Sequence, residues 1–405
     1  MASDQTTDAE IEARLRSAVE AFKAGNVTEA RAACEAVLQR RPDNIQAHTN
    51  LAILDRREGR LAEAAARFEA LLQRRPDDTA ARRAYAGLIL DMGRFDEAEA
   101  EYRRLAELTP DDPVVFSQLA VTLCYQLRPE EALPIRRRAS ELAPDDLGIA
   151  FAHAHNLALV GDIDGARRVV DRAKALAPDN AAVRYLEGAL AARPEVVPPP
   201  AFLAGTYNSV ARIYDTAVAP KLQNTANEHL FALFDREFDP ASRFAHVLDL
   251  GCGTGAMGAH LRSYADRLTG VDFSTGMIRI AEQKGIYDAL VVDDIVRYLA
   301  QSEDQFDLIV SSDALIHLGD MAELFQHIVL RTTQGGCVLF STEHGDCGTY
   351  APTIHFRFQH DPDYVERTAY AGGLIVLARE QAVVRVDERG MPTRGDLFLL
   401  QKMDF

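Results

Sequence analysis

Three glycines spaced two residues apart, Gly251, Gly253 and Gly255, follow the apolar run Val247–Leu250. Glycine is favoured where the backbone takes a positive φ or passes close to a ligand, because a Cβ would clash there. The pattern therefore predicts a buried strand that ends in a bare turn. Open α/β sheets bind ligands at such turns, so we expect the three glycines, and Cys252 between them, to contact a ligand.

Asp249 lies inside this predicted strand, two residues before the first glycine. A buried carboxylate is costly unless a cation or a hydrogen-bond donor meets it. The α-amino group of S-adenosylmethionine is a suitable partner. The glycines and this carboxylate together predict a site for S-adenosylmethionine.

Two alternatives explain the glycines differently. Gly253–Gly258 also fits the dinucleotide pattern G-x-G-x-x-G, but in that pattern the strand leads directly into the first glycine. Here the strand leads into Gly251, two residues earlier. A tight turn without any ligand is the second alternative, and Asp249 argues against it. A P-loop is excluded because no Gly-Lys-Ser/Thr follows the glycines.

Further acidic residues end the next two predicted strands. Asp272 closes the run Leu268–Asp272, 19 residues after Gly253, a spacing at which a carboxylate can accept hydrogen bonds from ribose hydroxyls. We expect the neighbouring residue, Phe273, to contact the cofactor as well. After Ala289–Val292, a carboxylate can meet the adenine amino group while an apolar side chain packs on the ring. These residues are Asp293, Asp294 and Ile295, although Asp293 could instead be only a helix N-cap.

The methyl acceptor would approach from the ends of later strands. His317 and His344 follow the predicted fourth and fifth strands, and either could act as a general base. Asp313 and Tyr214 could orient the acceptor, and Ser311, at the end of the fourth strand, completes the cofactor set. Each of the four acceptor-side residues could equally have only a structural role. The spacing of the His and Cys residues after the fifth strand matches no zinc pattern, so we predict no metal.

The elements that must hold these residues alternate between strand and helix. Phe306–Ser311 and Gly336–Ser341 supply the fourth and fifth strands, with helical segments between the strands. The βαβαβ order predicts a parallel, doubly wound α/β sheet over residues 201–405.

At this point the residues resemble the class I S-adenosylmethionine-dependent methyltransferases, over roughly residues 205–345. The resemblance is carried by Asp249–Gly255, Asp272, the pair Asp293/Asp294, and the run Phe306–Val310 followed by Ala314–His317. It implies a Rossmann-like fold and methyl transfer from S-adenosylmethionine. Tyr207–Asp215 looks like the helix that lids the cofactor in relatives of the quinone-biosynthesis methyltransferases.

The first half of the chain has a period of 34 residues. Five Pro-Asp pairs recur at this interval, beginning at Pro42, Pro76, Pro110, Pro144 and Pro178. Alanine recurs in two columns, and glycine marks a turn at Gly25, Gly59, Gly93 and Gly161, with Leu127 in the fourth place. The pattern resembles the tetratricopeptide repeat, whose helix pairs stack into a solenoid. We predict an all-α solenoid over residues 11–193, of five repeats and a capping helix at Ala181–Ala192.

Such repeats most often bind a protein, so we expect the groove of the solenoid to recruit a protein partner or substrate. Its inner positions carry Ile53, Gly87, Val121 and His155. The alternatives are self-association into a homo-oligomer and mere stabilisation of the second domain. Residues 194–200 predict a stiff proline-rich linker, and residues 1–10 are expected to be disordered.

Composition narrows the setting. The net charge of −17 disfavours nucleic acid as a partner, because nucleic-acid binding draws on clustered Lys and Arg. The five cysteines lack paired spacing, which indicates reduced thiols. There is neither a signal peptide nor an apolar run long enough to span a membrane. These features predict a cytoplasmic protein.

The whole layout resembles a bacterial group of predicted tetratricopeptide-containing methyltransferases. The resemblance includes Ser312–Asp320 and the tail at Gly395–Leu400. His317 stands where a tyrosine is expected in that group, and Asp361 where a serine is expected. We therefore predict a methyltransferase whose repeats recruit a partner. The alternative is a repeat-based scaffold protein with a non-catalytic cofactor-binding domain.

Overall fold

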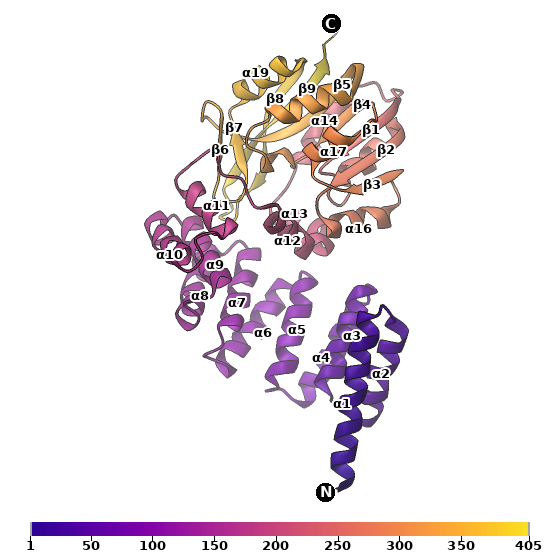
Figure 1. Cartoon of the computed structure of the whole chain (residues 1–405), viewed down its shortest axis with the longest axis vertical. Coiled ribbons are helices and arrows are strands. Elements are labelled where there is room, and N and C mark those ends of the chain that lie inside the picture. Colours follow the sequence, from indigo (N-terminus) through magenta and orange to yellow (C-terminus); the bar gives the residue numbers. More distant parts are fainter. Residues whose placement is uncertain (1, 404–405) are drawn as a thin grey trace. The chain divides into compact units, whose positions relative to one another are not determined.

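The structure is a computed structural model that describes residues 2–403. It divides into two compact units, residues 1–123 and 124–405. The first unit is helical and the second contains helices and one sheet of nine strands (Figure 1). The predicted fold class, a helical repeat domain followed by an α/β domain, is confirmed. The unit boundary, however, lies inside the repeat region and not at the proline-rich linker.

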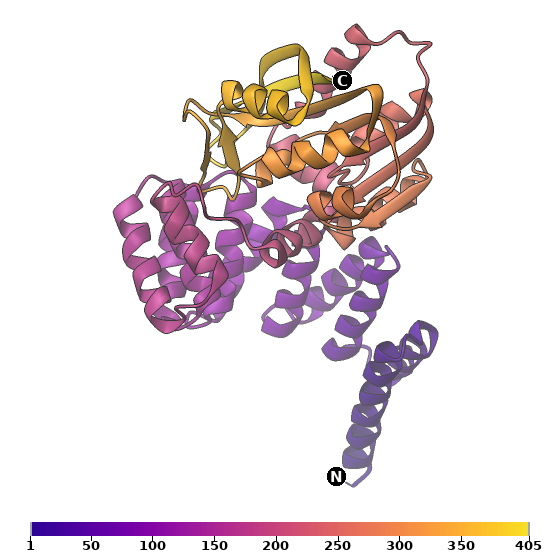
Figure 2. The same ribbon diagram turned by 45° about the horizontal axis from the view of Figure 1, so that its top comes forward.

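The first unit consists of antiparallel helix pairs that stack one after another (Figure 2). Its helices are α1 (Ala2–Lys23), α2 (Val27–Arg40), α3 (Ile45–Arg57), α4 (Leu61–Arg74), α5 (Thr79–Asp91), α6 (Phe95–Leu108) and α7 (Pro113–Tyr125), whose last residues belong to the second unit. The expected disorder at residues 1–10 differs from the structure, in which α1 begins at Ala2. Met1 lies outside the described residues.

The second unit begins with the remaining helices of the repeat region. These are α8 (Pro129–Leu142), α9 (Leu147–Leu159), α10 (Ile163–Leu176) and the capping helix α11 (Ala181–Leu190). Residues 194–199 form no helix, and Pro200 is the first residue of α12 (Pro200–Val210). Proline suits that position because its missing N–H has no partner in the first helical turn.

The repeat columns have direct structural causes. The alanines at one repeated position, Ala30, Ala64, Ala98, Ala132 and Ala166, are each at most 1% exposed, because the helices of a pair approach too closely for a larger side chain. The four column glycines adopt φ between 75° and 88°. Leu127, in the fourth place, adopts φ of 59°. The turn therefore requires the left-handed conformation even where the residue is not glycine.

The sheet has the order β3-β2-β1-β4-β5-β7-β6, with β9 paired to β5 and β8 to β9. Its strands are β1 (Phe244–Leu250), β2 (Ala265–Asp272), β3 (Ala289–Val292), β4 (Phe306–Ser311), β5 (Thr332–His344), β6 (Tyr350–Pro352), β7 (Phe358–His360), β8 (Leu374–Val386) and β9 (Pro392–Lys402). The first five are parallel, as predicted, but β9 runs antiparallel to β5 and β8. The sheet is therefore mixed and not wholly parallel.

Helices cover both faces of this sheet (Figure 1). Alternate residues of β1 point to opposite faces, so Val247 packs with α14 (Ala226–Glu237) and α15 (Ala256–Leu261). Leu248 packs on the other side, where the helices are α17 (Ile295–Gln301), α18 (Ala322–Arg331) and α19 (Pro362–Gly372). This doubly wound arrangement leaves the carboxyl ends of the parallel strands free to form a site.

Candidate methyl-transfer site

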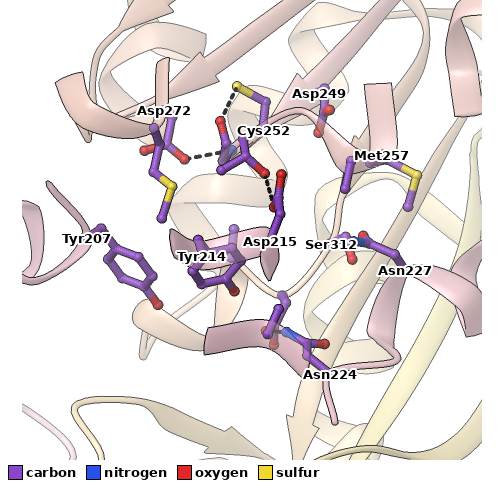
Figure 3. A pocket seen from close by; sticks show the side chains of 18 of the residues that line it. Tyr207, Tyr214, Asp215, Asn224, Asn227, Asp249, Cys252, Met257, Asp272 and Ser312 are labelled. Atoms are coloured by element: carbon purple, nitrogen blue, oxygen red, sulfur yellow. Dashed lines mark hydrogen bonds between the residues drawn. The ribbon is translucent and has the colours of Figure 1, made fainter. Parts of the chain in front are cut away.

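A cavity of about 520 Å³ lies at the carboxyl ends of β1, β2 and β4. Its wall combines the glycine turn after β1, the end of β2, the loop after β4 and part of the segment 207–228 (Figure 3). Of the predicted site residues, the wall contains Asp249, Gly251, Cys252, Gly253, Asp272, Phe273, Tyr214, Asp313 and His317.

The glycine turn has the geometry that its sequence predicts. Gly251, Gly253 and Gly255 have φ of 71°, 54° and 89°. A Cβ on Gly251 would lie 2.2 Å from the Cβ of Ala314, whereas a Cβ on Gly253 would meet nothing within 4 Å. Gly253 therefore leaves open space at the cavity wall. Gly255 precedes α15 and is not in the wall.

Asp249 is 1% exposed and lies in the wall. The Tyr287 hydroxyl donates a hydrogen bond of 2.7 Å to its Oδ2. Burial raises the pKa of the Asp249 carboxyl to about 7. The other groups that act on this pKa are Tyr287, Asp272 and the backbone at Gly258, and none of them is a cation. Among the described residues, the Asp249 carboxyl group therefore has no cationic partner, and a cationic ligand could pair with it.

Asp272 joins the end of β2 to the glycine turn. Its Oδ2 accepts a hydrogen bond of 3.0 Å from the backbone N–H of Gly253, and its Oδ1 one of 2.8 Å from that of Ser274. Burial raises the pKa of this carboxyl as well. The Cys252 thiol is also buried, which raises its pKa well above the usual value. The thiol is therefore protonated and unreactive at neutral pH.

The segment before β1 covers the glycine turn. It comprises α12, two short irregular helical turns, Ala211–Ile213 and Tyr214–Val218, and α13 (Ala219–Lys221). Asp215 accepts hydrogen bonds from Thr254 of the glycine turn, at 2.6 Å, and from Lys284, at 2.8 Å. In Figure 3, Tyr207, Tyr214 and Asn224 lie across the cavity from the carboxylates of Asp249 and Asp272. The position matches the expected lid.

Asp313 lies in the wall with φ of 54°, a strained conformation for a residue with a Cβ. Its Oδ2 accepts a hydrogen bond of 2.9 Å from Asn224, and its Oδ1 pairs with Arg385 of β8. Arg385 is 2% exposed and also pairs with Glu343 at 2.7 Å. The charge of Asp313 is thus balanced from within the protein. The sequence analysis missed Arg385, which follows no motif and lies 72 residues after Asp313.

His317 lies in the wall, but both ring nitrogens have partners. Nδ1 lies 3.0 Å from the carbonyl oxygen of Phe356, which can only accept, so Nδ1 carries the proton. Nε2 then accepts a hydrogen bond of 2.8 Å from the Tyr207 hydroxyl. Burial lowers the pKa of the imidazole to about 4. Both contacts oppose the expected role of His317 as a general base.

His344 does not lie in the wall of this cavity but lines a separate hollow, so the geometry gives its predicted role as an acceptor-side base no support. Its Nδ1 lies 2.7 Å from Asp396. The cause is the length of β5, which was expected to end at Ser341 and continues to His344. The pairing of β4 with β5 ends at Phe340, and the tip of β5 pairs with β7 instead. This extension carries the imidazole past the cavity.

The predicted adenine contacts also lie outside the wall. Asp294 is the N-cap of α17, where its side chain accepts from two backbone N–H groups. Asp293 pairs with Arg297 one turn later. Ile295 is 7% exposed within the core under the sheet. Ser311 lies outside the wall as well, and its hydroxyl donates a hydrogen bond of 2.8 Å to the carbonyl of Leu250, which ties β4 to β1.

Within residues 2–403, no three His, Cys, Asp or Glu side chains come close enough together to hold a metal ion. No helix in the same range combines the length and apolar character that crossing a membrane requires.

Two parts of the chain match models of known protein families. Residues 247–336 match a family model described as a methyltransferase domain. Residues 15–66 and 55–120 match two models described as tetratricopeptide repeats.

Two curated relatives are O-methyltransferases by name. Malonyl-(acyl-carrier protein) O-methyltransferase of Yersinia pestis is 29% identical over 140 residues, which are 35% of this chain and 49% of the relative. Ubiquinone biosynthesis O-methyltransferase of Coxiella burnetii is 29% identical over 112 residues, 27% of this chain and 48% of the relative. The chain thus spans about half the length of the curated relatives it matches.

Among solved structures, the N-methyltransferase NodS of Bradyrhizobium japonicum in complex with S-adenosyl-L-homocysteine is 19% identical. The match covers 49% of this chain and 99% of NodS, with a TM-score of 0.40. The family matches are what assign the two parts: the chain combines tetratricopeptide repeats, at residues 15–120, with a methyltransferase domain at residues 247–336.

Proposed function

We propose that the second domain, residues 201–405, binds S-adenosylmethionine and transfers its methyl group to an acceptor. The observation that carries this proposal is that Asp249 and Gly253 line the same cavity. A buried carboxyl group without a cation faces a turn whose missing Cβ leaves open space. The methyltransferase family match over residues 247–336 supports the same conclusion.

The residues present fit this cofactor. Asp249 can pair with its α-amino group. Each oxygen of Asp272 accepts one backbone N–H, and a carboxylate oxygen has a second lone pair, so both oxygens can also accept from ribose hydroxyls. Phe273 and Met257 provide apolar wall. Ser312 Oγ, also in the wall, is buried and has no hydrogen-bond partner among the described residues.

S-adenosylmethionine, when bound, supplies a methyl group on a positively charged sulfur. The task of the chain is to align an acceptor with that methyl group and to exclude water. Tyr207, Tyr214 and Asn224 lie on the side of the cavity opposite Asp249 and Asp272 (Figure 3), where they can orient the acceptor. His317 is neutral above pH 5, but the Tyr207 hydroxyl occupies its basic nitrogen.

The charge of the wall restricts the acceptor. The residues found to line the cavity include Asp215, Glu228, Asp249, Asp272 and Asp313, and they include neither lysine nor arginine. An anionic acceptor such as a carboxylate would meet no cation on this surface. We therefore infer a neutral or cationic acceptor.

The first prediction concerns Asp272. Changing Asp272→Asn removes the charge that strengthens hydrogen bonds to ribose, each worth about 1.5–3 kcal/mol when charge-assisted. Calorimetry should show the affinity for S-adenosylhomocysteine falling about 10- to 100-fold. The matched control is Asp294→Asn, which keeps an N-cap residue and should bind as the wild type does. Wild-type affinity in Asp272→Asn would exclude the ribose assignment.

The second prediction is a pH dependence that originates at Asp249. Burial gives this carboxyl a pKa of about 7, so it is protonated below that pH until a cation binds beside it. A cationic amino group binds the ionised form, so binding must release the proton. Between pH 5.5 and 7, the affinity for S-adenosylhomocysteine should rise by up to about tenfold per pH unit and level off above pH 7.

Calorimetry in two buffers of different ionisation enthalpy measures this proton release. Asp249→Asn should abolish the release and flatten the pH dependence. Wild-type binding that is independent of pH from 5.5 to 8 would contradict the pairing of Asp249 with the amino group.

We further infer that the repeats recruit a protein partner or the methyl acceptor. The first unit has a hollow of about 350 Å³ among α3, α4, α5, α6 and α7. Two of the expected inner positions, Ile53 and Gly87, line it, and Ile53 is 47% exposed. An exposed apolar side chain in a hollow suits an apolar side chain of a partner. Self-association through the same hollow is the alternative.

The third prediction separates these two roles. Ile53→Lys places a charge in the hollow, and Leu176→Lys places one at an equally exposed site on α10 outside it. Only Ile53→Lys should lower kcat/KM for the natural acceptor, by about tenfold, with the affinity for S-adenosylhomocysteine unchanged. Light scattering on both variants provides the second measurement. A smaller particle with unchanged kcat/KM in Ile53→Lys would favour self-association and contradict recruitment.

A further inference from the structure

A short segment of the methyltransferase domain packs against the last repeat. This segment, Thr353–Phe356, connects β6 to β7. Ile354 packs against the core formed by α9 and α10, and the Tyr185 hydroxyl of α11 donates a hydrogen bond of 3.2 Å to the carbonyl of Thr353. All of these residues belong to the second compact unit.

Phe356 is the centre of this contact. It is 8% exposed and has φ of 60°, a strained conformation for a residue with a Cβ. Four aromatic rings surround its ring at centroid distances of 4.6–5.5 Å: Phe202, His155, Tyr185 and Phe151. These contacts hold Phe356 in a conformation that it would not keep by itself.

The backbone of Phe356 is connected to the cavity through two hydrogen bonds. Its carbonyl accepts from Nδ1 of His317 at 3.0 Å, and Nε2 of His317 accepts from the Tyr207 hydroxyl at 2.8 Å. His317 and Tyr207 both lie in the cavity wall. Phe273, a third wall residue, packs against the same aromatic cluster and lies edge-on to Tyr207 at 5.9 Å.

The repeat side of the contact is also unusual. His155 occupies the inner-helix position that corresponds to Ile53 and Gly87 of earlier repeats, and its ring lies 5.1 Å from the ring of Phe356. The last repeat thus holds part of its own chain at the position where a repeat would contact a partner. Ile53 and Gly87, by contrast, line the hollow of the first unit.

We propose that Phe356 is a positioning residue for the acceptor end of the cavity, held in place by α9 and α11 of the repeat region. Its ring fixes its strained backbone, its carbonyl fixes the tautomer and orientation of His317, and His317 orients the Tyr207 hydroxyl. The proposal rests on the proposed function only for what the cavity binds. The repeat region therefore contributes to the methyl-transfer site through its packing, in addition to any partner that it recruits.

The test uses the full chain labelled with ¹⁵N at histidine. A long-range ¹H–¹⁵N correlation spectrum reports which imidazole nitrogen carries the proton, and His317→Gln identifies the signals of His317. The wild type should show the Nδ1–H tautomer. Phe356→Ala should lose that signature and raise hydrogen exchange in residues 207–214 at least tenfold. The control Phe238→Ala removes a ring that packs with Phe234 and Phe244, outside the wall, and should leave both measurements unchanged.

A folded Phe356→Ala variant with the wild-type His317 signature and unchanged exchange in residues 207–214 would overturn the proposal. If that variant does not fold, Phe356→Leu replaces it, with smaller changes in the same direction expected and unchanged values again contradictory. The affinity of the wild type for S-adenosylhomocysteine is measured separately. Its absence would overturn the proposed function, whereas the His317 signature would still decide the role of Phe356.

Discussion

The arrangement of the candidate site depends on one buried carboxyl group at the end of β1. Asp249 is 1% exposed, its carboxyl accepts a hydrogen bond from the Tyr287 hydroxyl, and burial raises its pKa to about 7. Leaving such a group without a cation costs stability. The glycine turn comes directly after β1. Three of its residues are glycines, because side chains at those positions would fill the space beside the Asp249 carboxyl group. Asp272 then holds the turn through the Gly253 N–H.

The parts of this site that sequence analysis could predict are those whose chemistry is local. Gly251, Gly253 and Gly255 each need a positive φ, so three glycines spaced two residues apart make the turn visible in the sequence. Asp272 then follows 19 residues after Gly253. The alanine columns are equally visible because every repeat imposes the same close packing. By contrast, the site residues that contact Arg385, Tyr287 and Phe356 lie far from them in the sequence, and no motif predicts these contacts. Sequence also could not tell that Asp294 caps α17 or that β5 extends far enough to remove His344 from the cavity.

The two compact units divide at residue 124 and not at the linker predicted for residues 194–200, whose role as a domain boundary stays a prediction. The prolines at residues 194–200 predict a boundary, and the chain there does lack regular structure before α12. Packing nevertheless continues across it, since Tyr185 and Phe151 from the repeat region enclose Phe356 together with Phe202 of α12. Composition marks where a chain is stiff, but it does not reveal which surfaces are buried against each other. The compact unit therefore begins within the repeats, at residue 124.

We propose that Asp249 and Asp272 hold the two polar ends of one cofactor in a single cavity. A crystal structure of the full chain with S-adenosylhomocysteine would show this pairing. We expect the α-amino group within about 3 Å of an Asp249 oxygen and both ribose hydroxyls at hydrogen-bond distance from Asp272. A ligand bound outside this cavity, or bound with its ribose away from Asp272 and its amino group away from Asp249, would show that the two carboxylates do not hold the cofactor.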